Sequence, residues 1–317
     1  MINLPIFESL EKSQRILIAG AGGGFDIYAG LPLYLMLKEV GKDVHLANLS
    51  FTNLSLVPDE RPSPALVPVT ADTVHEPIYF PELYLAQWFR AVRDEEVTVY
   101  SFEKCGVQPV LEAYKWLQSK FNFDTVVLVD GGTDILMRGD EVGLGTPIED
   151  MTSLSAVSQL EGVETKIVAC LGFGVDHFHG VQNSCTFQAI SELTEMDGFL
   201  GSFSLVNSME SAKQYMDACK FAFTEMPHHI SIVNASIMTA LRGKYGDVHF
   251  TPRTHGSTLW INPLMSVYWY FKLPVVADRC LYLDELKETE TLQDVKEAIR
   301  RGAYLKTEIR RGPFIPQ

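Results

Sequence analysis

The amino-acid sequence predicts an α/β protein in which a Rossmann-like, doubly wound and mainly parallel sheet carries helices on both faces. Two observations predict this fold. Short apolar runs alternate with helical patterns along the 317-residue chain, as in proteins built from strand–helix–strand units. The apolar runs also lack the polar alternation of strands with one face in water, so both faces of the sheet should be covered. We expect a single domain over residues 1–317, because no linker divides the chain.

The expected elements follow from these patterns in order. Strands are expected at 16–19, 44–49, 97–100, 126–129, 167–171, 199–205 and 275–277. The clearest helical patterns lie between them, at 83–92 and 110–121. In both helical patterns the apolar residues recur at spacings of three and four, which places them on one face of a helix.

Two segments fit neither pattern. Residues 51–81 contain six prolines, which is too many for a helix, but they are too apolar for a free linker. Residues 138–155 contain three glycines and a proline within their first ten positions. We expect both segments to be long loops or lids that fold over the surface.

Composition limits the classes of function. The chain is 46% hydrophobic and 21% charged, as in soluble globular proteins, and its net charge of −14 argues against nucleic-acid binding. The start of the chain lacks the basic and apolar runs of a signal peptide, and no apolar run is long enough to span a membrane. The five cysteines are scattered and form no C-x-x-C pair, which is typical of reduced thiols. We expect a cytoplasmic protein that binds a small molecule and no membrane or nucleic acid, with a homo-oligomer left open.

Three glycine-rich turns are the strongest functional signal. Each directly follows an expected strand and each carries an aspartate: the turns occupy residues 20–26, 130–134 and 171–180. The carboxyl ends of neighbouring parallel strands open onto one crevice, where ligands bind in sheets of this kind. The three turns should therefore meet at one edge of the sheet and form the functional site.

The first turn contains Gly22, Gly23 and Gly24, whose backbone N–H groups are predicted to contact a phosphate or nucleotide. A purely structural tight turn is the alternative. NAD binding is less favoured, because Phe25 stands where a dinucleotide fingerprint has its third glycine and Asn48 stands where it has a ribose-binding acid. Asp26 is either a helix N-terminal carboxylate or a ligand of a cation or substrate hydroxyl.

The second turn is rich in carboxylates. Asp130 and Asp134 are predicted, together with Asp176 of the third turn, to bind a divalent cation such as Mg²⁺ or Mn²⁺, because these ions prefer oxygen ligands. Asp130 ends an apolar strand, so its burial would be unfavourable without a partner. Asp130 is also a candidate catalytic residue. The same segment adds candidate ligand-binding residues (Gly131, Gly132 and Thr133). Further carboxylates follow in the next loop (Asp140, Glu141, Glu149 and Asp150), and a merely solvated acidic loop is the alternative for Asp140 and Glu141.

The third turn reads Asp176-His177-Phe178-His179. In an extended segment the two histidines would point to one side and Asp176 to the other. Imidazoles placed in this way act as general acids and bases or bind metals, so His177 and His179 are candidate catalytic residues; backbone hydrogen bonding at the strand end is the alternative. Gly174 is a candidate ligand-binding residue.

Polar residues late in the chain are candidates to complete the site. Arg253 is predicted to bind a carboxylate or phosphate group of the ligand through its planar guanidinium. Weaker candidates follow Pro227 and Arg253: His228, His229, Asn234, Thr254, His255, Gly256 and Ser257. A surface role is at least as well supported for each of them.

At these positions the chain resembles DUF1152, a family defined as a domain of unknown function. The resemblance lies in four segments, at residues 22–26, 46–51, 130–141 and 172–180, and so extends over most of the chain. It implies a soluble α/β fold but transfers no reaction.

From the residues we expect an enzyme that acts on a small polar or phosphorylated metabolite by metal-assisted hydrolysis or elimination. A nucleotide-binding or sensor protein without catalysis is one alternative. An NAD(P)-dependent oxidoreductase is the other.

Overall fold

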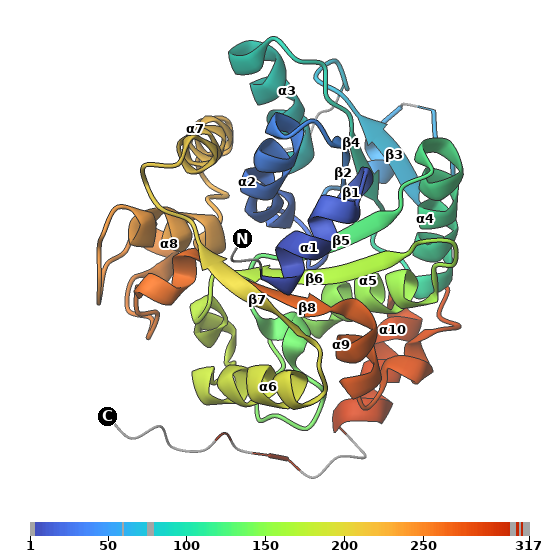
Figure 1. The fold of residues 1–317 in the computed structure, drawn as a ribbon, viewed down its shortest axis with the longest axis vertical. Helices are drawn as coiled ribbons and strands as arrows, with labels where there is room; N and C mark the ends of the chain where they lie inside the picture. The colour runs from blue at the N-terminus through green and yellow to red at the C-terminus, as the bar shows by residue number, and fades with distance from the viewer. Residues whose placement is uncertain (1–3, 59, 75–78, 305–308, 311, 313–317) are drawn as a thin grey trace.

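The centre of the protein is an eight-stranded sheet. A computed structural model describes residues 4–58, 60–74, 79–304, 309–310 and 312 (Figure 1). Five adjacent strands run parallel, and the added strands β3, β8 and β7 each pair antiparallel with a neighbour. The order across the sheet is β3 (Leu66–Val69), β4 (Val99–Phe102), β2 (Asp43–Leu49), β1 (Arg15–Gly20), β5 (Thr125–Asp130), β6 (Thr165–Leu171), β8 (Val267–Lys272) and β7 (Phe199–Ser204).

Helices cover the sheet on both faces (Figure 1). Alternate residues of β1 show the two layers: Ile16 and Ile18 belong to one buried cluster, and Leu17 and Ala19 belong to the other. The Ile16 cluster includes α1 (Pro5–Lys12), α2 (Asp26–Glu39), α3 (Pro81–Arg93), α7 (Glu210–Glu225) and α8 (Ile232–Leu241). The Leu17 cluster includes α4 (Val107–Phe121), α5 (Pro147–Gln159), α6 (Asn183–Glu195), α9 (Leu273–Arg279) and α10 (Leu292–Ile299).

Short helical turns connect these elements. They are η1 (Leu54–Leu56), η2 (Asp134–Leu136), η3 (Val175–His179), η4 (Pro252–Thr254), η5 (Pro263–Ser266), η6 (Leu283–Leu286) and η7 (Arg300–Tyr304). Two of them, η2 and η3, follow strands of the parallel core and carry aspartates of the glycine-rich turns.

Six of the seven expected strands are present, and the expected strand at 275–277 is wrong. Those residues lie in α9, where Pro274 occupies the first helical turn, a position that suits its fixed φ and missing N–H. The strand in this region is instead the aromatic run of β8, which precedes α9. The sequence patterns did not predict β3, an edge strand that tolerates Pro68 because it pairs on one side only.

The two irregular segments differ in structure. The described part of 51–81, which excludes residues 59 and 75–78, contains η1 and β3 among loops, and it ends where α3 begins at Pro81. The second segment was predicted to be irregular to residue 155, but α5 begins at Pro147 and is largely buried. Only residues 138–146 form a loop outside regular helices and strands.

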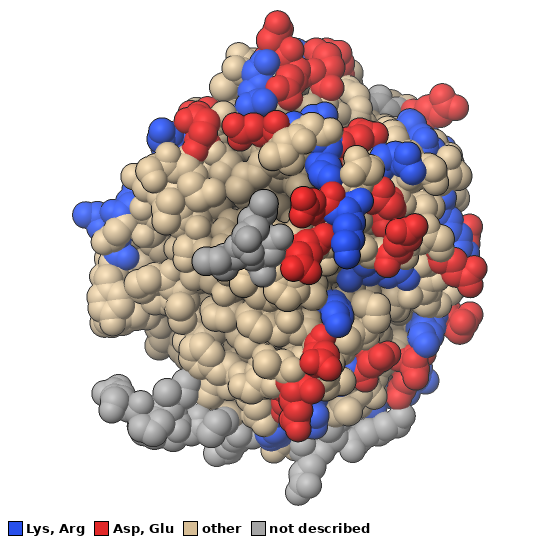
Figure 2. Space-filling view, viewed as in Figure 1, with Lys and Arg blue, Asp and Glu red and all other residues tan. Residues whose placement is uncertain are grey.

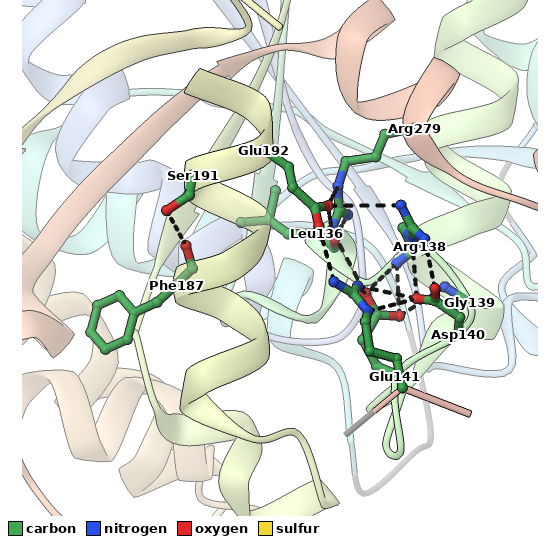
Figure 3. Close-up of polar contacts among 10 residues, drawn as sticks. Leu136, Arg138, Gly139, Asp140, Glu141, Phe187, Ser191, Glu192 and Arg279 are labelled. Atoms are coloured by element: carbon green, nitrogen blue, oxygen red, sulfur yellow. Dashed lines mark hydrogen bonds and ion pairs between the residues drawn. The ribbon is translucent and has the colours of Figure 1, made fainter. Parts of the chain in front are cut away.

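The acidic pair of this loop, Asp140 and Glu141, is buried, which rules out the alternative of a solvated acidic loop. Asp140 and Glu141 are 7% and 4% exposed. They form ion pairs with Arg138 of the same loop and with arginines from distant parts of the chain. Figure 3 shows these carboxylates converging with Glu192 of α6, Arg138 and Arg279. Arg310 joins the same group through Asp140 and Glu141, at 3.1 and 2.9 Å.

The surface seen in Figure 2 carries acidic and basic side chains interspersed over the side where α4 and α10 lie, with fewer around β7. The net charge of −14 is therefore not gathered into one acidic patch on this face. All five cysteines are free thiols, as expected. None of the described helices is long and apolar enough to cross a membrane.

Candidate functional site

The three glycine-rich turns lie together at one edge of the sheet, as predicted. They follow β1, β5 and β6, which are adjacent and parallel. Residues from all three turns line one cavity of about 300 Å³. Other segments complete its wall: Phe51, Tyr79, Thr146, Asp150, His229, Ser231, Ile232, Val233 and Arg253.

Five buried aspartates line this cavity. None is more than 9% exposed, and they come from α2, β5, η2, α5 and η3: Asp26, Asp130, Asp134, Asp150 and Asp176. Among the ion pairs of the described residues, none involves these five side chains. Lys104 pairs with Glu149, the residue before Asp150, at 2.6 Å and places its ammonium 4.4 Å from the centre of the Phe51 ring.

Backbone N–H groups fix four of the five carboxylates. In each of these aspartates Oδ2 is the acceptor. Gly22 N donates to Asp26 at 2.7 Å, and Ile135 N donates to Asp130 at 3.2 Å. Thr146 N donates to Asp134 at 2.7 Å, and Thr133 N donates to Asp176 at 2.6 Å. Hydrogen bonds to one oxygen orient a carboxylate while leaving its second oxygen available. Thr133, predicted to bind ligand, thus holds Asp176 instead.

The glycines of the turns are required by these carboxylates. A Cβ on Gly22 would lie 2.6 Å from Asp150 Oδ1, and a Cβ on Gly131 would lie 2.7 Å from Asp26 Oδ1. At Gly132 a Cβ would lie 2.6 Å from both oxygens of Asp176. Such distances are shorter than any normal contact, so only glycine allows the carboxylates to pack directly on the turn backbone.

Asp150 differs from the other four aspartates. Its side chain is 1% exposed, and neither carboxylate oxygen has a hydrogen-bond partner among the described residues. It approaches Asp26 and Asp130 so closely that one oxygen from each of the three lies within 4.8 Å of the others. Asp150 was expected among the acidic residues of a loop and was not part of the predicted metal site, whereas it lies on the buried face of α5.

Burial and mutual repulsion disfavour the charged forms of these carboxylates. Desolvation raises the pKa of Asp26 to about 7, with further contributions from Asp134 and Glu149. The pKa values of Asp130 and Asp150 are also raised well above the ordinary value. Burial is the main cause, and repulsion from Asp134 is the second. Burial in the folded protein therefore favours the protonated form of these carboxylates more strongly than in an exposed aspartate.

The third turn is not extended, which corrects the prediction for its histidines. Residues Val175–His179 form the 3₁₀ helix η3, bounded by Gly174 and Gly180 with φ of +86° and +88°. These left-handed glycines bend the chain at both ends of the turn. As a result Asp176 is buried against Thr133, while His179 lines the cavity.

His177 and Gly174 do not line the cavity. The His177 Nδ1 atom lies 3.3 Å from the carbonyl oxygen of Val181, which matches the alternative of backbone hydrogen bonding. A Cβ on Gly174 would meet the side chains of Asn262 and Asn183 rather than those of the cavity.

The three glycines of the first turn make contacts within the protein. Gly22 N donates to Asp26, and Gly23 and Gly24 lie against the rings of Phe51 and Tyr79. Gly22 and Gly23 line the cavity, whereas Gly24 does not.

Of the late polar candidates, His229 and Arg253 line the cavity. His228, Thr254, His255, Gly256 and Ser257 do not. Asn234 is buried behind the site, where it accepts from Tyr215 Oη at 2.8 Å and donates to the carbonyl of Phe25 at 3.2 Å.

Residues 17–312 match the model of a family described as "Protein of unknown function (DUF1152)". The chain belongs to this family. Neither a search of the curated proteins nor a search of the solved structures finds a match.

Proposed function

Starting from membership of a family without an assigned function, we propose that this protein is an enzyme that uses Mg²⁺ or Mn²⁺ to hydrolyse, or to eliminate a group from, a small polar or phosphorylated metabolite. The observation that carries the proposal is the carboxylate of Asp150, which is fully buried without a hydrogen-bond partner among the described residues. A buried carboxylate without a partner is strongly unfavourable unless it binds a cation or a proton.

The group of three carboxylates that includes Asp150 fits a hard divalent cation, which prefers oxygen ligands. Asp26, Asp130 and Asp150 would hold it, because their oxygens lie within 4.8 Å of one another. This set differs from the one expected from the sequence, which combined Asp130 with Asp134 and Asp176. The latter two orient an oxygen toward Thr146 and Thr133, and in the proposal they supply negative charge around the cation.

The chain supplies distinct groups for the reaction. When bound, a divalent cation supplies Lewis-acid activation of a substrate oxygen or of water. His179 lines the cavity at its exposed side and would transfer a proton to or from the substrate. Tyr79 and Phe51 form an aromatic wall that would exclude water from one side of the ligand.

The strand order supports a Rossmann-like, doubly wound arrangement as part of the proposal. From β1 the chain adds β2 and β4 on one side, and then β5 and β6 on the other. The point of reversal lies between β1 and β5, where sheets of this kind bind their ligands. Asp26 begins α2 after the turn that follows β1, and Asp130 is the last residue of β5, so both residues belong to the two strands that flank this point.

The NAD(P) alternative receives less support from the same edge. Asn48, at the position of a ribose-binding acid, is 0% exposed and donates to the Gly24 carbonyl and to Glu82. The Gly22 N–H, which would face a pyrophosphate, is occupied by Asp26. A cavity of about 300 Å³ also lies at the small end of ligand pockets, which span roughly 300–1,000 Å³. The other alternative, a sensor that binds a nucleotide without turnover, is distinguished from an enzyme by the experiment below.

The test is calorimetric titration of the cation-free protein with Mn²⁺, followed by turnover assays with a panel of phosphate esters and hydroxy acids. We expect one Mn²⁺ site in the wild type, at least a tenfold weaker site in Asp150→Asn, and unchanged affinity in Asp284→Asn, whose exposed side chain pairs with Lys287. Absence of Mn²⁺ binding in the wild type, or equal affinity in Asp150→Asn, would refute the cation site. Binding of Mn²⁺ and a nucleotide without any turnover would favour the sensor.

A further inference from the structure

We propose that Arg253 binds an oxyanion of the substrate, so that the site recognises a small molecule carrying a phosphate or carboxylate group. The inference rests on the proposed function, because it concerns the ligand of the same cavity. It assigns the two ends of the cavity to different parts of the substrate: the aspartates to the cation and its oxygen ligands, and Arg253 to a peripheral anion.

Arg253 is fixed at the rim of the cavity by its own backbone. It lies in η4, where the Thr251 hydroxyl accepts from the Arg253 N–H at 3.4 Å. Thr251 and Thr254 are 3% and 2% exposed, and Thr254 Oγ1 donates to the Thr251 carbonyl at 3.0 Å while lying 2.9 Å from His249 Nδ1. The buried, hydrogen-bonded turn therefore fixes the backbone of Arg253 and sets where its exposed side chain begins.

The guanidinium of Arg253 is also only partly used within the protein. Its NH1 group donates to the Ile230 carbonyl at 2.8 Å, and no ion pair of Arg253 is found among the described residues. Five aspartates line the same cavity, yet the arginine pairs with none of them. One hydrogen bond restrains the guanidinium, and its remaining N–H groups can bind a phosphate or carboxylate in bidentate geometry.

The neighbours of Arg253 favour an anion at this rim. His229 and Ser231 line the cavity with Arg253 and can donate hydrogen bonds. The ring of His229 lies edge-on to Tyr79, with 5.5 Å between ring centres, which holds it against the aromatic wall. A substrate in the cavity would thus meet carboxylates at the sheet edge and donors at the rim.

The experiment is calorimetric titration with inorganic phosphate and, separately, with malonate, in saturating Mg²⁺ and without it. We expect Arg253→Gln to weaken binding of the anion about tenfold or more, as for loss of a hydrogen bond to a charged group, and to leave Mg²⁺ affinity unchanged. Arg253→Lys should retain part of the affinity. Arg242→Gln is the matched control, because Arg242 lies over the Phe250 ring and does not line the cavity.

The outcomes separate this inference from the proposed function. Tighter binding of phosphate than of malonate would identify a phosphoryl group as the source of the oxyanion, and the reverse would identify a carboxylate. Loss of anion binding in Asp150→Asn with wild-type affinity in Arg253→Gln would overturn the inference, because the cation alone would then hold the anion. Failure of both anions to bind the wild type would also overturn it. Arg253-dependent binding in a protein that binds no Mg²⁺ would support the oxyanion site while the proposed function fails.

Discussion

Gly22 lies directly against Asp150: a Cβ placed on Gly22 would be 2.6 Å from Asp150 Oδ1. Gly22 comes from the turn between β1 and α2, and Asp150 comes from α5. Because α2 and α5 cover opposite faces of the sheet, this contact links the turn that leads to one helix layer with a helix of the other. It explains why a glycine is needed at a turn whose N–H is already used by Asp26.

Gly22→Ala should displace the carboxylate of Asp150. The added methyl group forces Asp150 or the turn to shift, which we expect to cost about 1–3 kcal/mol of stability and to weaken Mn²⁺ binding at least tenfold. Chemical denaturation and calorimetry measure the two effects. Gly41→Ala is the control, because Gly41 has φ +82° and open space around its Cβ position, so this variant should lose stability without losing Mn²⁺ affinity. Unchanged Mn²⁺ affinity in Gly22→Ala would show that the contact between Gly22 and Asp150 does not shape the cation site.

Asp150→Asn should make the cation-free protein more stable. The substitution keeps the shape of the side chain and removes a carboxyl group that must take up a proton on folding at pH 8. We expect a gain of roughly 1–3 kcal/mol. Mg²⁺ should stabilise the wild type, by about 2.7 kcal/mol at a hundredfold excess over its dissociation constant, and should not stabilise the variant. Thermal denaturation with and without Mg²⁺ checks both statements.

Asp140→Asn is the matched control for this prediction. Asp140 is also buried, but it pairs with Arg138 at 2.6 Å and with Arg310 at 3.1 Å. Its neutralisation should therefore lower stability, with or without Mg²⁺. A destabilised Asp150→Asn protein would mean that Asp150 has a partner beyond the described contacts.

Glu82 should make folding depend on pH. Its side chain is 0% exposed, and burial raises its pKa from 4.5 to about 7. Between these values the unfolded chain loses the proton while the folded chain keeps it, so stability falls as pH rises from about 4.5 to 7 and then levels off. The loss should be about 3 kcal/mol. Denaturation across this range should give a flatter profile for Glu82→Gln and the wild-type slope for Glu112→Gln, whose carboxylate is 60% exposed.

The parallel core and the meeting of the turns could be predicted from the sequence, because both follow from local signals. Apolar runs mark β1, β5 and β6, and the glycines and aspartates stand directly after them. The place of Asp150 beside Asp26 and Asp130 could not be predicted in this way. A carboxylate on the buried face of a helix has no local pattern, and the glycines before Pro147 suggested a longer loop. Likewise, the bend at η3 depends on the left-handed Gly174 and Gly180, whose conformation the sequence permits but does not specify.

Arg310 should stabilise the loop that leads to α5. Its side chain is 19% exposed and contacts Asp140, Glu141 and Glu192, and its backbone N–H donates to the Asp140 carbonyl at 2.5 Å. Arg310→Met leaves three carboxylates with fewer partners, and we expect a loss of about 3–5 kcal/mol in chemical denaturation.

The control for Arg310 is Arg300→Met. Arg300 pairs with Glu297 on the surface, where the two side chains are 55% and 40% exposed. Such pairs contribute about 0–1 kcal/mol, so the control should be close to wild type. Equal stability of the two variants would show that the network in Figure 3 holds its geometry without Arg310.

His179 and His177 form a natural pair for testing proton transfer, since they lie two residues apart in η3 and only His179 lines the cavity. With Mn²⁺ bound, His179→Gln should lower kcat for phenyl phosphate by about a hundredfold, because general acid catalysis contributes about 10²–10⁴-fold. The loss should be smaller for p-nitrophenyl phosphate, whose better leaving group needs less protonation. His177→Gln should retain wild-type kcat with both esters. Equal losses with the two esters would assign His179 to binding rather than proton transfer, and no loss with either would remove it from the reaction.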